Sequence, residues 1–415
     1  MTEQMNVPTL RFSEFDGLWS QNKTPIKILA GNAYKQQEYT DNGYLLIQGL
    51  HIQPDKIELE ESPKYVAVDG SKHLKIGFGD IVLGLNRPIT NNQLKACRFY
   101  LKEESVLYQR AGKLKFDTAK LGTEFLYQYL RTPVFMKQLD LELIGSDQPY
   151  IKSDLFQATK NIFPTIVEQQ KIASFLSKVD EKIALLTEKK DKLTEYKKGV
   201  MQQLFNGKWE EQDGQLIFIP PTLRFKADDG SEFPDWEEKK GAKLFASISN
   251  KDHNSDLPVL AITQNQGAIP RSLIDYNISV ADTSVASYKV VEKGDFIISL
   301  RSFQGGIEYS EYTGICSPAY VILRPKIDIS DYFYKYYLKT YPFIVEMQKR
   351  LEGIRDGKII SYKYFSEISM PYPTKVEQDK IVCFLSALEQ KISLATSELE
   401  KAKEWKRGLL QQMFV

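Results

Sequence analysis

Two segments of the chain have an apolar spacing that predicts long amphipathic helices. Alternating steps of four and three residues from Ile172 reach apolar residues at eight of ten positions, and the same steps from Ile381 do so at nine of ten. Several heptads with charged flanks are typical of a coiled coil. The predicted helix-pairing residues are Ile172, Leu176, Val179, Ile183, Leu186, Leu193 and Val200 in the first segment and Ile381, Leu385, Leu388, Ile392, Leu399 and Leu409 in the second.

The ends of these helices carry capping signals. Thr165 and Thr374 precede the apolar pattern, and a glutamate follows each after three residues, which predicts a capping box in which the glutamate bonds back to the threonine. The pair Asn206-Gly207 predicts a left-handed residue that closes the first helix.

The chain contains an internal duplication. Residues 164–205 recur as 373–414 at an offset of 209, with 21 of 42 positions identical. Two weaker echoes accompany the helices: Pro8-Thr9-Leu10-Arg11-Phe12 returns as Pro221-Thr222-Leu223-Arg224-Phe225, and Gly79-Asp80-Ile81-Val82 resembles Gly294-Asp295-Phe296-Ile297. Two copies of one unit predict pseudo-two-fold symmetry, which suits a two-fold partner or paired sites on duplex DNA.

The pattern predicts four parts: globular domains at 1–163 and 209–372, and helical segments at 164–208 and 373–415. A helix of forty residues is ~60 Å long, longer than a domain of this size, so we expect the two helices to pair antiparallel. The alternative is that each apolar stripe packs only on its own domain.

The globular parts read as mixed α/β, so the expected fold class is α+β. Strand-like runs occur at Tyr44–Ile47, Asp80–Leu83, Phe296–Ser299 and Tyr320–Leu323, and helix-like stretches at Thr123–Leu139 and Asp331–Leu351. The aromatic run Tyr332–Tyr337 could stack on bases, but its helical spacing favours a place in the core.

Composition excludes several classes of protein. The 415 residues include three cysteines and three histidines without CxxC or HxxxH spacing, so we expect neither a disulfide framework nor a metal site, and a reducing cytoplasm. We expect no membrane span, because no apolar run approaches ~18–20 residues. Glycine fingerprints and phosphate loops for nucleotides are absent. Asp235 with Glu238-Lys239-Lys240 mimics a nuclease signature, but a solvated acidic linker explains it better.

The net charge of +1 hides a sorting of charge along the chain. Residues 209–240 carry nine acids and four bases, whereas residues 331–363 carry seven bases and four acids. Net charge therefore neither favours nor excludes a nucleic acid as partner.

Each globular half has loops that combine polar, basic and glycine residues. Arginine reads guanine, and asparagine or glutamine reads adenine, in the major groove of DNA. Solvated loops explain any one of these runs, but their occurrence at matching places in both halves favours DNA binding. The candidate DNA-binding residues are Asn86, Arg87, Asn91, Asn92, Lys95, Gln148 and Lys152 in the first half and Arg301, Ser302, Gln304, Arg355, Lys358 and Lys363 in the second.

The repeated Pro-Thr-x-Val-Glu-Gln-x-Lys-Ile helix opening at 164–172 and 373–381, used after two divergent domains, closely resembles the DNA-specificity subunit of type I restriction–modification systems. The lead-in at 145–152 is also similar, whereas 353–360 departs further. The resemblance implies that each globular domain is a target-recognition domain for one half of a bipartite, asymmetric site on double-stranded DNA. It implies that the helices set the spacer between the half-sites and dock two modification (methyltransferase) subunits, with two restriction subunits in the full assembly.

The same resemblance implies that the chain has no catalytic residues of its own. S-adenosylmethionine, ATP and Mg would belong to the partner subunits. Two other functions stay open: a coiled-coil adaptor that presents two ligand-binding domains to protein partners, and a cryptic nuclease, which the missing motifs disfavour.

Overall fold

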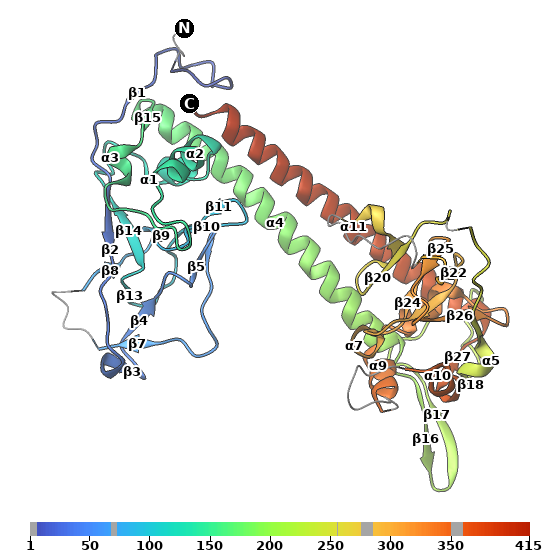
Figure 1. Ribbon diagram of the computed structural model, residues 1–415. Helices are drawn as coiled ribbons and strands as arrows, with labels where there is room; N and C mark the ends of the chain where they lie inside the picture. Colours follow the sequence, from blue (N-terminus) through green and yellow to red (C-terminus); the bar gives the residue numbers. More distant parts are fainter. Residues whose placement is uncertain (1–5, 68–72, 255, 275–284, 350–359) are drawn as a thin grey trace. The chain divides into compact units, whose positions relative to one another are not determined.

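A computed structural model describes residues 6–67, 73–254, 256–274, 285–349 and 360–415 of the chain. The chain forms two compact units. Unit 1 comprises residues 1–188 and 396–415, and unit 2 comprises residues 189–395. Each unit therefore contains one globular part together with a portion of each of two long helices, α4 (Ile166–Leu204) and α11 (Lys375–Gln412) (Figure 1). The predicted α+β fold with two long helices is confirmed.

Within each unit the two helices run antiparallel. In unit 1, Lys406 of α11 forms an ion pair with Asp180 of α4. In unit 2, Nζ of Lys197 on α4 lies 2.5 Å from Oε1 of Glu389 on α11. From Asp180 to Lys197 the residue number increases along α4, and from Lys406 to Glu389 it decreases along α11 by the same amount, as an antiparallel register requires.

The apolar stripes are buried by the opposite helix and by the globular part together. In unit 1, Leu176 and Val179 of α4 share a core with Phe125 of the globular part and with Leu409 and Phe414 at the end of α11. In unit 2, Leu204 of α4 and Leu385 of α11 share a core with Phe333. Of the predicted helix-pairing residues, Ile172, Leu176, Val179, Val200, Ile381, Leu385, Leu388, Leu399 and Leu409 are buried, and Ile183, Leu186, Leu193 and Ile392 are half-buried.

Unit 1 is built on two sheets, with strand orders β12-β9-β14-β2 and β3-β7-β4-β13-β8, in which β4 and β13 pair in parallel and the other pairs are antiparallel. Its strands are β1 (Ser20–Gln21), β2 (Lys27–Ala30), β3 (Tyr39–Thr40), β4 (Tyr44–Ile47), β5 (Ile52–Gln53), β6 (Lys56–Ile57), β7 (Tyr65–Val66), β8 (Lys75–Ile76), β9 (Ile81–Gly84), β10 (Ile89–Thr90), β11 (Gln93–Leu94), β12 (Ala96–Arg98), β13 (Ser105–Leu107), β14 (Ala111–Lys115) and β15 (Ile162–Phe163). Its short helices are η1 (Gln36–Glu38), α1 (Thr123–Tyr129), α2 (Pro133–Glu142) and α3 (Leu155–Ala158).

Unit 2 is built around the antiparallel sheet β19-β26-β23-β24. Its strands are β16 (Lys208–Gln212), β17 (Gln215–Ile219), β18 (Glu237–Lys240), β19 (Phe245–Ile248), β20 (Leu260–Thr263), β21 (Gly267–Pro270), β22 (Lys289–Val291), β23 (Phe296–Ile298), β24 (Glu308–Tyr309), β25 (Gly314–Cys316), β26 (Val321–Pro325) and β27 (Ser369–Tyr372). Its short helices are α5 (Gly241–Leu244), η2 (Arg271–Leu273), α7 (Ser302–Gly305), α8 (Asp331–Tyr337), α9 (Tyr341–Gln348) and α10 (Tyr362–Glu367).

Each predicted helix-like stretch before the long helices is two helices rather than one. In unit 1, Thr132 caps α2 by accepting a hydrogen bond from the Phe135 amide, and Pro133 occupies the first helical position. In unit 2, Thr340 precedes α9, and a proline again lies in its first turn. Proline has no N–H and starts a helix more readily than it continues one, so a break at these positions follows. The predicted stretches are therefore helical, but each contains a break that the prediction did not include.

The predicted capping boxes are also wrong in their second half. Thr374 accepts a hydrogen bond from the backbone of Glu377 at 3.4 Å, as a cap should. The carboxylate of Glu168, however, binds the guanidinium of Arg11 through two contacts of 2.7 Å. Glu377 binds Arg224 in the equivalent way. Paired, charge-assisted hydrogen bonds are stronger than a bond to the helix cap, so the glutamates join the duplicated Pro-Thr-Leu-Arg-Phe segments to the helices.

The predicted closing residue of α4 is wrong as well. Asn206 and Gly207 do not have positive φ angles. Asn206 instead accepts from the Thr222 backbone at 2.9 Å and donates to the Thr222 hydroxyl at 2.7 Å. The end of α4 is therefore held by the second Pro-Thr-Leu-Arg-Phe segment rather than by a local left-handed turn.

Candidate nucleic-acid interface

In unit 1 the structure brings two separately predicted loops together. The backbone N–H of Arg87 donates to the carbonyl of Pro149 at 2.7 Å, and that of Ile151 donates to the carbonyl of Leu85 at 2.9 Å. Asn86, half-buried, forms a β-bridge with Tyr150. The residues that follow β9 and the residues that follow α2 therefore form one surface.

A tight hairpin extends this surface. Strands β10 and β11 pair through Thr90 and Gln93, so that Asn91 and Asn92 alone form the turn. Both have positive φ, 49° and 59°, as a type I′ turn requires, and asparagine tolerates this conformation better than most residues. Both side chains are exposed, whereas Lys95 beyond β11 is half-buried. The turn fixes two neighbouring amide side chains at the tip of a short, rigid element.

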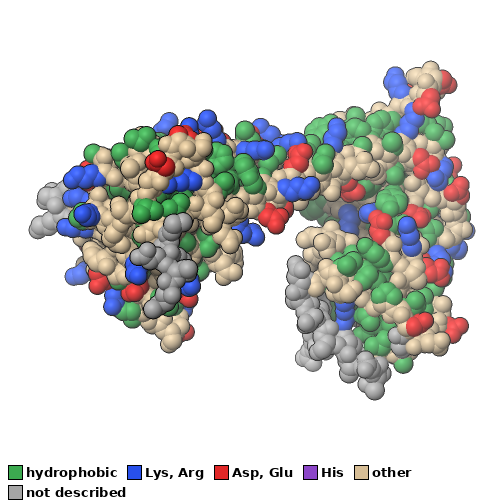
Figure 2. Space-filling model, turned by 90° about the horizontal axis from the view of Figure 1, so that it is seen from above, with side chains coloured by type: hydrophobic (Ala, Val, Ile, Leu, Met, Phe, Trp, Pro, Cys, Tyr) green, Lys and Arg blue, Asp and Glu red, His purple; other side chains and the backbone are tan. Residues whose placement is uncertain are grey.

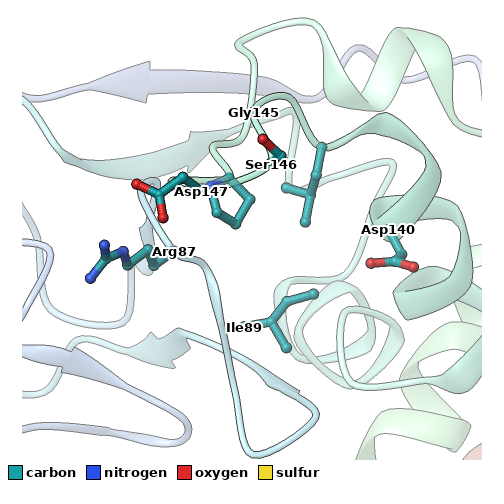
Figure 3. A pocket seen from close by; sticks show the side chains of 8 residues that line it. Arg87, Ile89, Asp140, Gly145, Ser146 and Asp147 are labelled. Carbon is teal, nitrogen blue, oxygen red and sulfur yellow. The ribbon is translucent and has the colours of Figure 1, made fainter.

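An open cavity of about 610 Å³ lies where the two loops meet. Arg87, itself at a φ of +46°, and Asp147 lie at one side of this cavity, with Asp140 of α2 across from them (Figure 3). Ile89, Leu143 and Ser146 also line it. The exposed Gln148 and Lys152 continue the same loop.

The side chains around the cavity can read bases through hydrogen bonds. Arginine matches guanine, asparagine matches adenine, and a carboxylate accepts from the amino group of cytosine. Asp147 belongs to the predicted loop but did not appear among the predicted site residues. Asp140 carried no signal in the sequence, because only the packing of α2 brings it to the cavity.

In unit 2 the predicted residues after β23 form a single turn of helix. Arg301 and Gln304 are exposed, whereas Ser302 is buried and accepts a hydrogen bond from the Ser299 backbone at 2.9 Å. The Gln348 side chain of α9 donates to the carbonyl of Phe303 at 2.8 Å, which ties this turn to α9. Arg301 and Gln304 therefore project from a fixed backbone.

Sequence reasoning missed a second polar tip beside this turn. Gln264, Asn265 and Gln266 are exposed at the tip of the β20–β21 hairpin, which closes at Gly267 with a φ of +73°. The amide of Gln264 donates to the carbonyl of Arg301 at 3.5 Å. The signal was available, since three consecutive amide residues stand between two apolar runs.

The structure does not bring the remaining candidates to this place. Lys363 is exposed on α10, which packs against α5, whereas the turn at Arg301 packs against α9. Arg355 and Lys358 lie outside the described residues. The aromatic run at 332–337 is a core element, since Phe333, Tyr334, Tyr336 and Tyr337 are buried.

A network of charges joins the globular part of unit 1 to its helices. Arg131, which follows α1, lies 2.6 Å from the carboxylate of Asp55 and 3.2 Å from that of Asp180 on α4. Lys406 of α11 completes the network at Asp180. Burial and the nearby Arg131 lower the pKa of Lys406 to about 8. The network joins the β5–β6 turn and the end of α1 to the helix pair within this unit.

No group of three His, Cys, Asp or Glu side chains suited to a metal occurs among the described residues. In the same part of the chain, no helix has the length and apolar character that crossing a membrane demands. Cys97 and Cys316 are buried, and burial raises the pKa of both thiols to about 12, which disfavours their reactive thiolate form.

Comparison with known proteins points to one family. Residues 27–195 and 234–404 match the family model described as Type I restriction modification DNA specificity domain. The chain is 32% identical over 190 residues to the Type I restriction enzyme MjaVIII specificity subunit of Methanocaldococcus jannaschii, a match that covers 45% of this chain and 44% of that protein, less than half its length.

Two solved structures have a similar fold. The S subunit of a type I restriction–modification system from M. genitalium has a TM-score of 0.53 and 16% identity, with 99% of both chains covered. A chain from a study of complex assembly and conformational transition of the type I R-M system has a TM-score of 0.52 and 16% identity, covering 95% of this chain and 99% of that chain. At these identities the similarity concerns the fold.

Proposed function

Because the chain belongs to the type I restriction–modification DNA specificity family, we propose that it is the DNA-recognition subunit of such a complex. Each globular part reads one half of a bipartite, asymmetric site on double-stranded DNA. The paired helices set the number of unread base pairs between the halves and dock the modification subunits.

One observation carries this proposal: a duplicated scaffold presents two different polar surfaces. Unit 1 offers Arg87 with Asn91 and Asn92, and unit 2 offers Gln264 with Arg301. The helices retain half of their residues between the copies, while the two hairpin tips, Ile-Thr-x-Asn-Gln in both, stand at different places: the first follows β9 and the second precedes β23. Such a division suits a protein that must hold one geometry and read two different half-sites.

A second observation supports two copies of one protein partner. Six large apolar side chains on the long helices are between 48% and 66% exposed, and the 209-residue offset relates them in three pairs. The pairs are Val167 with Val376, Leu185 with Leu394, and Tyr196 with Trp405. Hydrophobic side chains also reach the surface of both units among charged ones on the face drawn in Figure 2. Apolar residues repeated in this way mark equivalent interaction sites.

We therefore propose that two modification subunits dock on these equivalent sites. Two restriction subunits complete the assembly in the cytoplasm. The chain itself is non-catalytic, and S-adenosylmethionine, ATP and Mg bind to the partner subunits. The absence of predicted catalytic motifs from the sequence is consistent with this division of labour.

Methylation mapping tests the proposal. A plasmid from cells that express the chain with its cognate modification subunit is sequenced by a single-molecule method that detects methylated adenine. We expect a bipartite asymmetric motif that disappears without this chain and weakens with Arg87→Glu or Arg301→Glu. If a stable complex forms without any chain-dependent motif, DNA recognition is wrong and the adaptor function takes its place.

A further inference from the structure

Unit 2 contains a hairpin that has no counterpart among the described residues of unit 1. Strands β16 and β17 lie between the end of α4 and Pro221, where the second Pro-Thr-Leu-Arg-Phe segment begins. Figure 1 shows the hairpin extending away from the sheets of unit 2.

The base of the hairpin is anchored in the core. Trp209 and Phe218 face each other across the two strands with ring centroids 5.4 Å apart, and Phe218 contacts Trp236 at 6.1 Å. The tip is a two-residue turn in which Asp213 and Gly214 have φ angles of 51° and 78°. The hairpin is therefore held at one end and sharply turned at the other.

The outer part of the hairpin is exposed to solvent. Residues 211–217 are all exposed, and Leu216 is 69% exposed although it lies on the same face as Phe218. Ile217 on the other face is 41% exposed. A two-stranded ribbon is marginally stable alone, and free strand edges with apolar side chains invite another chain to pair with them. These features indicate a surface that a partner covers.

The charge of this surface identifies the class of partner. The hairpin carries three acids, Glu210, Glu211 and Asp213, and one base, Lys208, which pairs with Glu210. The sequence from 209 to 240 carries nine acids and four bases. A DNA backbone would be repelled from such a surface, because its phosphates require cationic side chains. A basic protein segment has the complementary charge.

A small cavity at the base of the hairpin fits one basic side chain. Its volume is about 100 Å³, and Trp209, Phe218 and Tyr337 line it together with Glu237 and Glu238. Lys208 also lines it, and its charge is paired with Glu210. Aromatic faces attract ammonium and guanidinium groups, and nearby carboxylates neutralise their charge. Lysine or arginine therefore suits this cavity better than an apolar anchor does.

We infer that the β16–β17 hairpin and the cavity at its base dock a basic segment of a modification subunit. This inference rests on the proposed function. The hairpin follows α4 after only three intervening residues, so it extends the helix that carries the exposed Tyr196.

Hydrogen exchange measured by mass spectrometry on the full chain tests the inference. The chain is compared alone, with duplex DNA, with its modification subunits, and with both. We expect the amides of residues 211–217 to become protected on addition of the modification subunits and to stay unprotected with DNA alone. Exposed amides in an assembled complex that binds DNA would overturn the hairpin inference and leave the proposed function intact, and protection by DNA alone would also overturn it. If no complex forms, the proposed function fails and the inference fails with it.

Substitutions provide the second measurement. Leu216→Glu adds a like charge to an exposed position, so the fold should persist and the affinity of the modification subunits should fall roughly tenfold. Glu210→Lys with Glu211→Lys should slow association and reverse its salt dependence at this site. Leu273→Glu, at a leucine 60% exposed on η2, is the matched control. Wild-type affinity for both hairpin variants would overturn the inference.

Discussion

Lys406 of α11 pairs with Asp180 of α4, and the duplication repeats this contact in unit 2 with the roles of the helices exchanged. The offset of 209 relates Asp180 to Glu389 and Lys197 to Lys406, so the acid lies on α4 in unit 1 and on α11 in unit 2. One ancestral contact between two antiparallel helices thus occurs twice in a single chain. The two copies differ in burial, since the lysine side chain is 7% exposed in unit 1 and 21% in unit 2.

The more buried of the two ion pairs, between Lys406 and Asp180, predicts that the stability of the protein depends on pH. Burial and Arg131 lower the pKa of Lys406 from 10.5 to about 8, although Asp180 opposes this shift. The unfolded state therefore binds more protons between pH 8 and 10.5, so the contribution of this lysine to stability rises as the pH rises through that window. Relative to Lys406→Met, the free energy of unfolding of the wild type should increase by about 1–2 kcal/mol between pH 7.5 and 9.5. Denaturant titration at both pH values measures it.

Lys197→Met is the matched control, because it removes the equivalent ion pair at a more exposed position. We expect its difference from the wild type to change less with pH. An equal change for both variants would contradict the role of burial at Lys406.

Glu168→Gln tests the contact between the Pro-Thr-Leu-Arg-Phe segment and α4. The carboxylate is 2% exposed and accepts from Arg11 and from Nε1 of Trp19 at 3.2 Å. Removing its charge leaves a largely buried guanidinium without its counter-ion, which should cost about 3 kcal/mol of unfolding free energy. Glu377→Gln should have a similar effect through Arg224, since the two glutamates are equivalent. Thermal and denaturant unfolding measure both, and a loss below 1 kcal/mol in either variant would contradict the expected cost.

The sequence predicts the long helices well and the details of their ends poorly. The stripe that contains Leu176 and Leu385 is visible because helical periodicity is local. The true partner of Glu168 is not visible in the sequence, because Arg11 lies 157 residues away. A threonine followed by a glutamate three residues later is equally compatible with a capping box. Pro133 is a local signal for the break between α1 and α2, but the helical periodicity on either side of it hides this signal.

The candidate interface shows the same limit. Arg87 and the two asparagines stand in a run whose chemistry is readable, and the β10–β11 hairpin keeps that run together. Asp140 reaches the cavity only through the packing of α2, which no local pattern encodes. Gln264 was readable in the sequence, but its place beside Arg301 depends on a hydrogen bond between loops 37 residues apart.

The duplication predicts that the chain tolerates circular permutation. In unit 1 the amide of Leu10 donates to the carbonyl of Gln412 at 3.0 Å, and in unit 2 the amide of Leu223 donates to that of Gln203 at 3.2 Å. The first and last segments are therefore joined by the contact that a continuous chain makes in unit 2. A Gly/Ser linker from Val415 to Asn6, with new termini between Asp229 and Gly230 in an exposed loop, should preserve the fold.

We expect the permuted chain to unfold cooperatively, with a free energy within about 2 kcal/mol of the wild type, and to support the same methylation motif. Circular dichroism during denaturation and plasmid sequencing measure these two properties. Loss of cooperative unfolding would show that the contact between Leu10 and Gln412 does not substitute for a covalent connection.

The polar tips of the β10–β11 and β20–β21 hairpins predict that substitutions in one tip change recognition of only one half of the DNA site. Asn91→Gly with Asn92→Gly removes both amides of the β10–β11 turn, and glycine keeps the positive φ that the turn needs. Gln264→Ala removes one amide from the tip in unit 2. Because one paired contact to a base contributes about 1–3 kcal/mol of discrimination, each variant should relax the motif in its own half by roughly tenfold and leave the other half unchanged. Glu58→Gln, at an acid that is 54% exposed and lies outside both tips and outside the β16–β17 hairpin, is the control that should leave both halves intact. Methylation mapping of the three variants decides the assignment, and a change in both halves from a single variant would contradict separate recognition by the two units.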